Sequence, residues 1–119
     1  MFAVLRVLSL FAGIGGFDLG LERTGGFKTV AFCEIDPYAS RVLKKHWPDV
    51  PNLGDVTKAE FPDADFICAG FPCQDISCAN SKGEGIHGER SGLWREMARI
   101  IGEVRPRLVL VENSPMLVG

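Results

Sequence analysis

The sequence predicts an α/β fold in which a Rossmann-like parallel sheet carries helices on both faces. Three observations lead to this prediction. Short apolar runs bounded by turn residues alternate along the chain with segments of helical periodicity. These runs lack the polar alternation of a half-exposed strand, so both faces of the sheet are expected to be covered. Glycine, cysteine or acidic residues stand within three positions of the end of each run, as in loops at the carboxyl ends of parallel strands.

Five strands and three helices are expected in order. The strands are residues 4–10, 29–33, a short one near 52–53, 65–70 and 108–111, and the helices are 16–24, 37–46 and 92–104. Gly25 and Gly26 stop the first helix, whereas Asp36 and Pro37 supply an N-cap and a first-turn proline to the second. Right-handed crossovers between parallel strands then predict the strand order 3-2-1-4-5. Residues 77–91 are rich in glycine and serine, which is typical of an active-site lid.

The composition indicates one soluble, folded domain. The chain has 119 residues, of which 46% are hydrophobic and 24% charged. A net charge of -2 lacks the basic surface of a nucleic-acid binder, which argues against DNA binding by these residues alone. No membrane-spanning apolar stretch or export signal is visible, so we expect a cytoplasmic protein with reduced cysteines. The cysteine spacing fits no zinc site, and no metal is expected.

A glycine-rich turn follows the first strand at residues 11–16, with the sequence FAGIGG. Gly13, Gly15 and Gly16 let the backbone approach a ligand closely, and Glu34 follows the next strand, where a carboxylate can accept bonds from ribose hydroxyls. The pattern predicts a nucleoside-containing cofactor; the alternative is a packing turn beside a solvated glutamate. The spacing alone does not separate NAD from S-adenosylmethionine, although the missing third spaced glycine disfavours a pyrophosphate.

Two residues at neighbouring strand ends are candidates for catalysis. Cys73 lies between Pro72 and Gln74 after the fourth strand, where a stiff, exposed loop suits a nucleophilic thiol. Glu112 closes the fifth strand, so a thiolate and a carboxyl are expected to face one pocket. The alternatives are an inert buried thiol and a solvated or capping glutamate. Asp55, at the end of the third strand, can accept a bond from an adenine amino group or serve as an ordinary turn residue.

Together these residues resemble the DNA (cytosine-5) methyltransferase family along essentially the whole chain. The similar segments are residues 11–16, Glu34-Ile35-Asp36, Gly54-Asp55-Val56, Gly70-Phe71-Pro72-Cys73-Gln74, residues 90–94 and Glu112-Asn113. The proline-cysteine motif is highly specific, whereas the glycine motif is shared with many methyltransferases. The resemblance implies a truncated S-adenosylmethionine-dependent methyltransferase fold that holds the N-terminal half of the catalytic domain.

The resemblance also implies a reaction and a set of site residues. S-adenosylmethionine is the implied methyl donor, and its implied pocket residues are Phe11, Gly13, Ile14, Gly15, Gly16, Glu34, Ile35, Asp55, Val56, Pro72 and Leu93. Cys73 is implied to add as a thiolate to C6 of a cytosine flipped out of double-stranded DNA. Glu112 is implied to hydrogen-bond and protonate N3, so that C5 becomes nucleophilic.

The family pattern is incomplete in residues 1–119. Ser114 stands where the family most often has valine, and the arginine-containing motif, the target-recognition domain and the terminal helix of the family are missing. We therefore expect a partial catalytic domain, either a fragment or one subunit of a split enzyme that a second polypeptide completes. The alternatives are a non-catalytic, cofactor-binding remnant and a nicotinamide-dependent oxidoreductase, which leaves Cys73 and Glu112 without a role.

Overall fold

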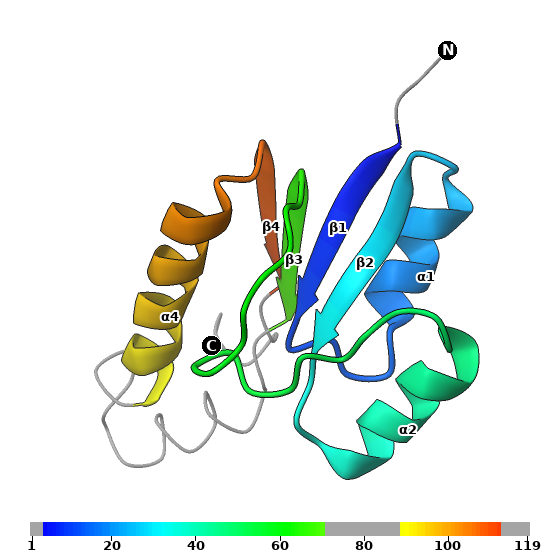
Figure 1. Ribbon diagram of the computed structural model, residues 1–119, viewed down its shortest axis with the longest axis horizontal. Coiled ribbons are helices and arrows are strands. Elements are labelled where there is room, and N and C mark those ends of the chain that lie inside the picture. The colour runs from blue at the N-terminus through cyan, green and yellow to red at the C-terminus, as the bar shows by residue number, and fades with distance from the viewer. Residues whose placement is uncertain (1–3, 71–88, 113–119) are drawn as a thin grey trace, which may run out of the picture.

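A computed structural model of the protein describes residues 4–70 and 89–112. The elements are β1 (Leu5–Leu10), α1 (Gly16–Arg23), β2 (Phe27–Cys33), α2 (Pro37–His46), β3 (Phe66–Gly70), α4 (Glu89–Val104) and β4 (Leu108–Glu112). The strands form a four-stranded sheet with the order β2-β1-β3-β4, and every pair is parallel. All four carboxyl ends therefore lie at the same edge of the sheet, the lower edge in Figure 1.

The predicted Rossmann-like α/β sheet is confirmed, except that its expected edge strand is reduced to a single bridge. Near residues 52–53 the structure has an isolated parallel bridge between Phe32 and Asn52 where we expected a short strand. Two backbone hydrogen bonds hold it, from Phe32 N to the Pro51 carbonyl (2.9 Å) and from Leu53 N to the Phe32 carbonyl (2.7 Å). The order 3-2-1-4-5 holds with its first member reduced to this bridge. Most of the predicted lid at 77–91 lies outside the described residues.

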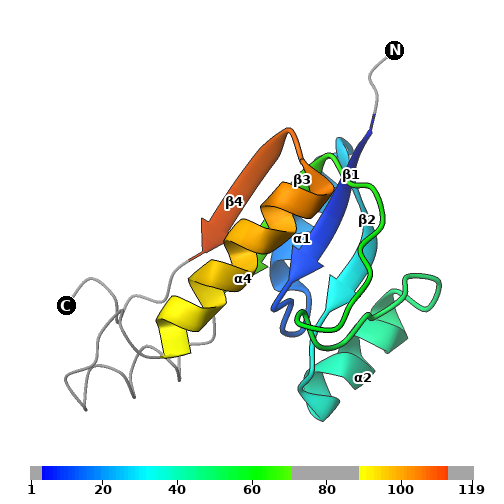
Figure 2. The same ribbon diagram turned by 60° about the vertical axis from the view of Figure 1, so that its left-hand side comes forward.

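Helices cover both faces of the sheet, and Figures 1 and 2 show α1 and α4 on opposite sides of it. The side chains of each strand alternate between the two faces, as the pleat of a strand requires. The α1 face is built from Val7, Phe66 and Cys68, with Phe17 and Leu21 packed against them. The α4 face is larger and contains Leu8, Leu10, Ala31, Cys33, Ile67, Ala69, Met97 and Ile100. The core is therefore split by the sheet into two layers.

A bulge in β2 decides which side chains reach the α4 face. Val7 pairs with Thr29 but Leu8 pairs with Ala31, so Val30 is an extra residue in β2. An extra residue reverses the alternation of the residues after it. Thr29 accordingly bonds to α1 through its hydroxyl, whereas Ala31 and Cys33 join the core beneath α4. The bulge thus turns the end of β2 toward the α4 side of the sheet.

A buried carboxyl joins α1 to three strands. Asp18 is 0% exposed and accepts hydrogen bonds from Ser9 Oγ of β1 (2.9 Å) and Thr29 Oγ1 of β2 (3.1 Å). The thiol of Cys68 in β3 donates a long bond of 3.9 Å to the same carboxyl. Burial raises the pKa of Asp18, and the two hydroxyl bonds oppose that rise. Each of these three strands therefore contributes one polar side chain to the first turn of α1.

Replacing Asp18 is expected to change how stability depends on pH. Because the pKa of Asp18 is raised in the folded state, the folded chain holds its proton to a higher pH than the unfolded chain does. The free energy of unfolding therefore falls as the pH rises above about 4, until the carboxyl ionises in the folded state as well. Asp18→Asn removes the ionisation and keeps an acceptor and a donor for the two hydroxyls. Urea unfolding from about pH 4 to pH 8 should show Asp18→Asn gaining stability relative to wild type.

Asp18→Ala is the matched control for this experiment. It leaves the hydroxyls of Ser9 and Thr29 without their acceptor, which is expected to cost about 1–3 kcal/mol even at low pH. A stability difference between Asp18→Asn and wild type that stays constant across the pH range would contradict the raised pKa.

Candidate functional site

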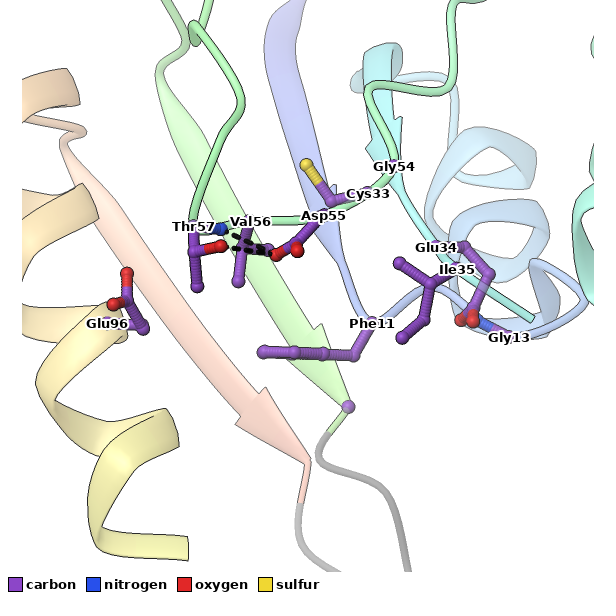
Figure 3. A pocket seen from close by; sticks show the side chains of 11 residues that line it. Phe11, Gly13, Cys33, Glu34, Ile35, Gly54, Asp55, Val56, Thr57 and Glu96 are labelled. Atoms are coloured by element: carbon purple, nitrogen blue, oxygen red, sulfur yellow. Dashed lines mark hydrogen bonds between the residues drawn. The ribbon is translucent and has the colours of Figure 1, made fainter. Parts of the chain in front are cut away.

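A pocket of about 420 Å³ lies at the carboxyl edge of the sheet on the α4 side, a volume within the usual range of small-molecule sites (Figure 3). Its lining residues are Phe11, Gly13, Cys33, Glu34, Ile35, Gly54, Asp55, Val56, Thr57, Gly70 and Glu96. They come from the ends of β1, β2 and β3, from the loop around residues 54–57 and from α4. The position follows the rule that open parallel sheets bind ligands outside the carboxyl ends of their strands.

Glu34 joins the turn after β1 to the end of β2. Its Oε1 accepts a hydrogen bond from Gly13 N (2.7 Å), and its Oε2 accepts one from Asp36 N (2.9 Å). Phe11 N donates to the Cys33 carbonyl (2.8 Å), so the ladder between β1 and β2 extends into the turn. Phe11 and Gly13 have φ values of 53° and 59°, in the left-handed region that suits glycine at the second position. The carboxylate is thus fixed by backbone N–H groups.

Asn52 connects the two loops that carry the acidic residues of the pocket. Its Oδ1 accepts bonds from Glu34 N and Gly54 N, both at 3.0 Å. Its Nδ2 donates to the Glu34 carbonyl and to Ser40 Oγ, again at 3.0 Å each. The side chain therefore fixes Glu34 and the loop before Asp55 relative to each other and to α2. The sequence alone does not indicate this role, since an asparagine close to a glycine is also typical of an ordinary turn.

Asp55 is held in one orientation by Thr57. Its Oδ1 accepts bonds from Thr57 N (2.9 Å) and Thr57 Oγ1 (2.8 Å), shown as dashed lines in Figure 3. The backbone bond and then the hydroxyl bond from Thr57 lower the pKa of Asp55, so it is ionised at neutral pH. Oδ2 makes no hydrogen bond within residues 4–70 and 89–112 and can accept one from a ligand. The spacing Asp-x-Thr is the sequence signal that identifies Thr57.

The predicted cofactor residues divide into three groups. Phe11, Gly13, Glu34, Ile35, Asp55 and Val56 line the pocket together. Ile14, Gly15 and Gly16 line two neighbouring hollows beside α1 instead. Pro72 lies outside the described residues, and Leu93 is described only as part of the α4 backbone. The further lining residues Cys33, Gly54, Thr57, Gly70 and Glu96 were not among the predicted site residues.

The strands that precede the two candidate catalytic residues end side by side. β3 and β4 are neighbours, as predicted, and Gly70 at the end of β3 pairs with Glu112 at the end of β4. Cys73 follows Gly70 by three positions and lies outside the described residues, and Glu112 is described through its backbone. The register places Gly70, the last described residue before Cys73, beside the backbone of Glu112.

The two described cysteines are unsuited to nucleophilic chemistry. Cys33 and Cys68 are free, buried thiols. Burial, reinforced by a nearby carboxylate in each case, raises the pKa of both to about 12. A thiol with such a pKa is almost fully protonated at neutral pH and is a poor nucleophile.

Neither a membrane span nor a metal centre is found in the part of the chain that the structure describes. None of its helices combines the length and apolar character needed to cross a bilayer. It also contains no group of three histidine, cysteine or acidic side chains arranged around a metal position.

Comparison with known proteins identifies relatives along almost the whole chain. The chain is 44% identical to the type II methyltransferase M2.BsuMI of Bacillus subtilis (strain 168), over 96% of this chain and 30% of the relative. It is 44% identical to M.CviJI of Paramecium bursaria Chlorella virus IL3A, over 94% of this chain and 31% of the relative. It is 41% identical to M.HhaI of Haemophilus parahaemolyticus, over 92% of this chain and 33% of the relative.

The chain spans about a third of the length of each of these type II methyltransferases. Residues 5–119 match the family described as C-5 cytosine-specific DNA methylase. The pocket, the strand order and this match agree, and the chain belongs to the C-5 cytosine-specific DNA methylase family.

Proposed function

We propose that this chain binds S-adenosylmethionine in the pocket between Glu34 and Asp55 and contributes to methyl transfer onto C5 of cytosine in DNA. The family to which it belongs uses this cofactor and acts on DNA. The observation that carries the proposal is the pair of oriented carboxylates at one pocket, Glu34 fixed by two backbone N–H groups and Asp55 by Thr57. A nucleoside needs acceptors of this kind for its ribose hydroxyls and its adenine amino group.

The chemical character of the pocket fits this cofactor. Phe11, Ile35 and Val56 offer apolar surface for a purine ring. We propose that Glu34 accepts bonds from ribose hydroxyls and that Asp55 Oδ2 accepts the adenine amino group. Both carboxylates attract the positively charged sulfonium and repel phosphate groups. A cofactor that combines adenosine with a cation and lacks phosphates matches this set of groups.

The same geometry argues against a nicotinamide-dependent oxidoreductase. Dinucleotide sites bind the pyrophosphate with backbone N–H groups of the glycine-rich turn and the following helix N-terminus. Here the Gly13 N–H already donates to Glu34 Oε1 at 2.7 Å. A phosphate at this point of the turn would meet a carboxylate and lose the donor that it needs.

Cys73 and Glu112 are the proposed catalytic residues. We propose that Cys73 Sγ forms a bond to C6 of a flipped cytosine while Glu112 delivers a proton to N3, which makes C5 nucleophilic. S-adenosylmethionine, when bound, supplies the methyl group that C5 accepts. Loss of the C5 proton and cleavage of the bond between Cys73 and C6 then restore the aromatic ring. The adjacency of β3 and β4 and the protonated thiols of Cys33 and Cys68 support this assignment.

We further propose that this chain is one part of a larger catalytic domain. In β4 the apolar side chains of Leu108, Val109 and Leu110 are 55%, 39% and 43% exposed, although successive residues face opposite sides of the sheet. A strand that is apolar on both faces has the composition of a strand inside a larger parallel sheet. A polypeptide that supplies the remaining part of the domain would cover this strand, and the short match to each relative agrees with such an arrangement.

Isothermal titration calorimetry of the purified chain tests the cofactor assignment. S-adenosylmethionine is expected to bind and NADH to show no heat of binding. Glu34→Gln is expected to weaken binding of S-adenosylmethionine by about 10-fold or more, since hydrogen bonds to charged groups contribute about 1.5–3 kcal/mol. The matched control is Glu60→Gln, which changes an exposed glutamate outside the pocket. Binding of NADH without binding of S-adenosylmethionine would overturn the assignment.

A further inference from the structure

We propose that Arg99 is a positioning residue for recognition of the adenine amino group, because its guanidinium fixes the loop that carries Asp55. This inference rests on the proposed cofactor site. Arg99 does not line the pocket itself and acts through the backbone of Val56, which does. Nothing in the motifs that identified the pocket points to this arginine.

Arg99 connects α4 to the loop around residues 54–57. Its Nη2 donates a 2.8 Å bond to the Val56 carbonyl. Glu96 Oε2 receives bonds from Nε (2.9 Å) and Nη2 (2.7 Å), and Glu103 Oε1 receives one from Nη1 (2.8 Å). The guanidinium carbon also lies 6.0 Å from the centre of the Phe61 ring. The two carboxylates stand one turn before and one turn after Arg99 on α4, so they fix the plane of the guanidinium from both sides.

The bond to the Val56 carbonyl is the part of this network that reaches the pocket. Ion pairs between partly exposed side chains on one helix contribute little by themselves, and the Arg99 side chain is 38% exposed. The Val56 side chain is buried in the core beneath α4, and its carbonyl faces the guanidinium. Figure 3 shows Glu96 of α4 to one side of Thr57, Val56 and Asp55, with Glu34 and Ile35 to the other side. The helix and the loop are therefore joined by a bond from a guanidinium that also binds two carboxylates, a set of contacts that the planar arginine head group suits better than an ammonium.

Asp55 is then anchored on both sides. Before it, Gly54 N donates to Asn52 Oδ1 (3.0 Å), and after it the Val56 carbonyl accepts from Arg99. Thr57 orients the carboxylate within that frame by binding Oδ1. Loss of Arg99 frees the second anchor while leaving the first, and the direction of Oδ2 becomes variable. We therefore expect the preference for a ligand with the adenine amino group over one without it to fall by more than the affinity for both ligands falls.

The test compares two ligands that differ only at the amino group. S-adenosylhomocysteine and its analogue with unsubstituted purine in place of adenine are titrated into the full 119-residue chain by calorimetry. Wild type is expected to prefer the adenine compound by about 10-fold or more. Arg99→Met retains the apolar stem beside Phe61 and removes every donor, and it is expected to reduce this preference by about 10-fold. A change in folding alone would weaken both ligands equally and leave the ratio intact.

Two control variants show whether the loss of preference is specific to the bond between Arg99 and Val56. Arg6→Met breaks an ion pair with Asp65 that lies outside the pocket, and Glu103→Gln removes a partner of Arg99 while leaving the bond to Val56. Both variants are expected to keep the wild-type preference. If Arg99→Met folds poorly, Arg99→Lys keeps the charge beside Glu96 and Glu103, and it is expected to lose the preference through loss of the bond to the carbonyl.

The possible outcomes separate this inference from the proposed function. If wild type prefers the adenine compound and a folded Arg99 variant shows the same preference, the positioning role of Arg99 is overturned. The proposed cofactor site is not affected by that result. A wild-type chain that binds neither compound would overturn the proposed function and this inference with it. Equal affinity of wild type for the two compounds would remove the assigned role of Asp55, and with it that of Arg99.

Discussion

Gly15→Ala is expected to destabilise the fold by about 2–5 kcal/mol, the sum of a left-handed backbone and an overfilled core. Gly15 has a φ of 86°, and a Cβ there would lie 2.5 Å from Trp47 Cζ3 and 2.9 Å from Leu43 Cδ2. Trp47 cannot move away easily. Its Nε1 donates to Glu22 Oε1 (2.8 Å), and its ring makes an edge-to-face contact with the Phe32 ring, with 5.3 Å between the ring centres. The extra methyl group must therefore displace α2 from the turn after β1.

Gly13→Ala is the matched comparison in the same turn. Its φ of 59° is also left-handed, but a Cβ at this position meets nothing within 4 Å. Only the backbone cost of about 1–2 kcal/mol remains. Urea unfolding followed by circular dichroism measures both variants. Equal losses in the two would mean that the backbone conformation alone sets the cost, and that contact with Trp47 contributes nothing.

The sequence predicts the architecture well because burial of strands on both faces leaves a strong local signal. The apolar runs at residues 4–10 and 65–70 correspond to β1 and β3 with shifts of one residue at their starts. The short third strand was overestimated for a local reason. Pro51 has no N–H to donate, and the Asn52 side chain is engaged by Glu34 and Gly54, so only one bridge to Phe32 forms.

The candidate site is only partly predictable, since its fine geometry depends on contacts between distant residues. Glu34 and Asp55 follow strand-end positions and were identified from them. The bulge at Val30, which turns Cys33 toward the pocket, lies inside a uniform β-forming run and has no local marker. Asn52 and Arg99 act through backbone groups that are 18 and 43 positions away in the chain. Spacing within one element cannot reveal such partners.

Cys73→Ala is expected to abolish covalent capture of DNA and to lower methyl transfer by at least about 10³-fold. The proposed reaction needs a thiolate to interrupt the conjugation of cytosine before C5 can accept a methyl group. A duplex that contains 5-fluorocytosine traps the adduct, because fluorine cannot leave C5 as the proton does. The suitable protein is a chimera in which this chain replaces the matching segment of M.HhaI, with which it shares 41% identity. The 119-residue chain alone is expected to give neither adduct nor methyl transfer, since β4 is then uncovered.

Cys68→Ala and Cys78→Ala distinguish the nucleophile from the other thiols of the chimera. The Cys68 thiol is buried with its pKa raised to about 12, so its removal is expected to leave the adduct unchanged. Cys78 lies five positions after Cys73, and a catalytic role for it would make Cys78→Ala the inactive variant. A denaturation-resistant complex with Cys73→Ala would refute attack by Cys73. A complex that forms with every variant except Cys73→Ala would instead support attack by Cys73, which follows Gly70 by three positions, and Gly70 pairs with Glu112 in the register of β3 and β4.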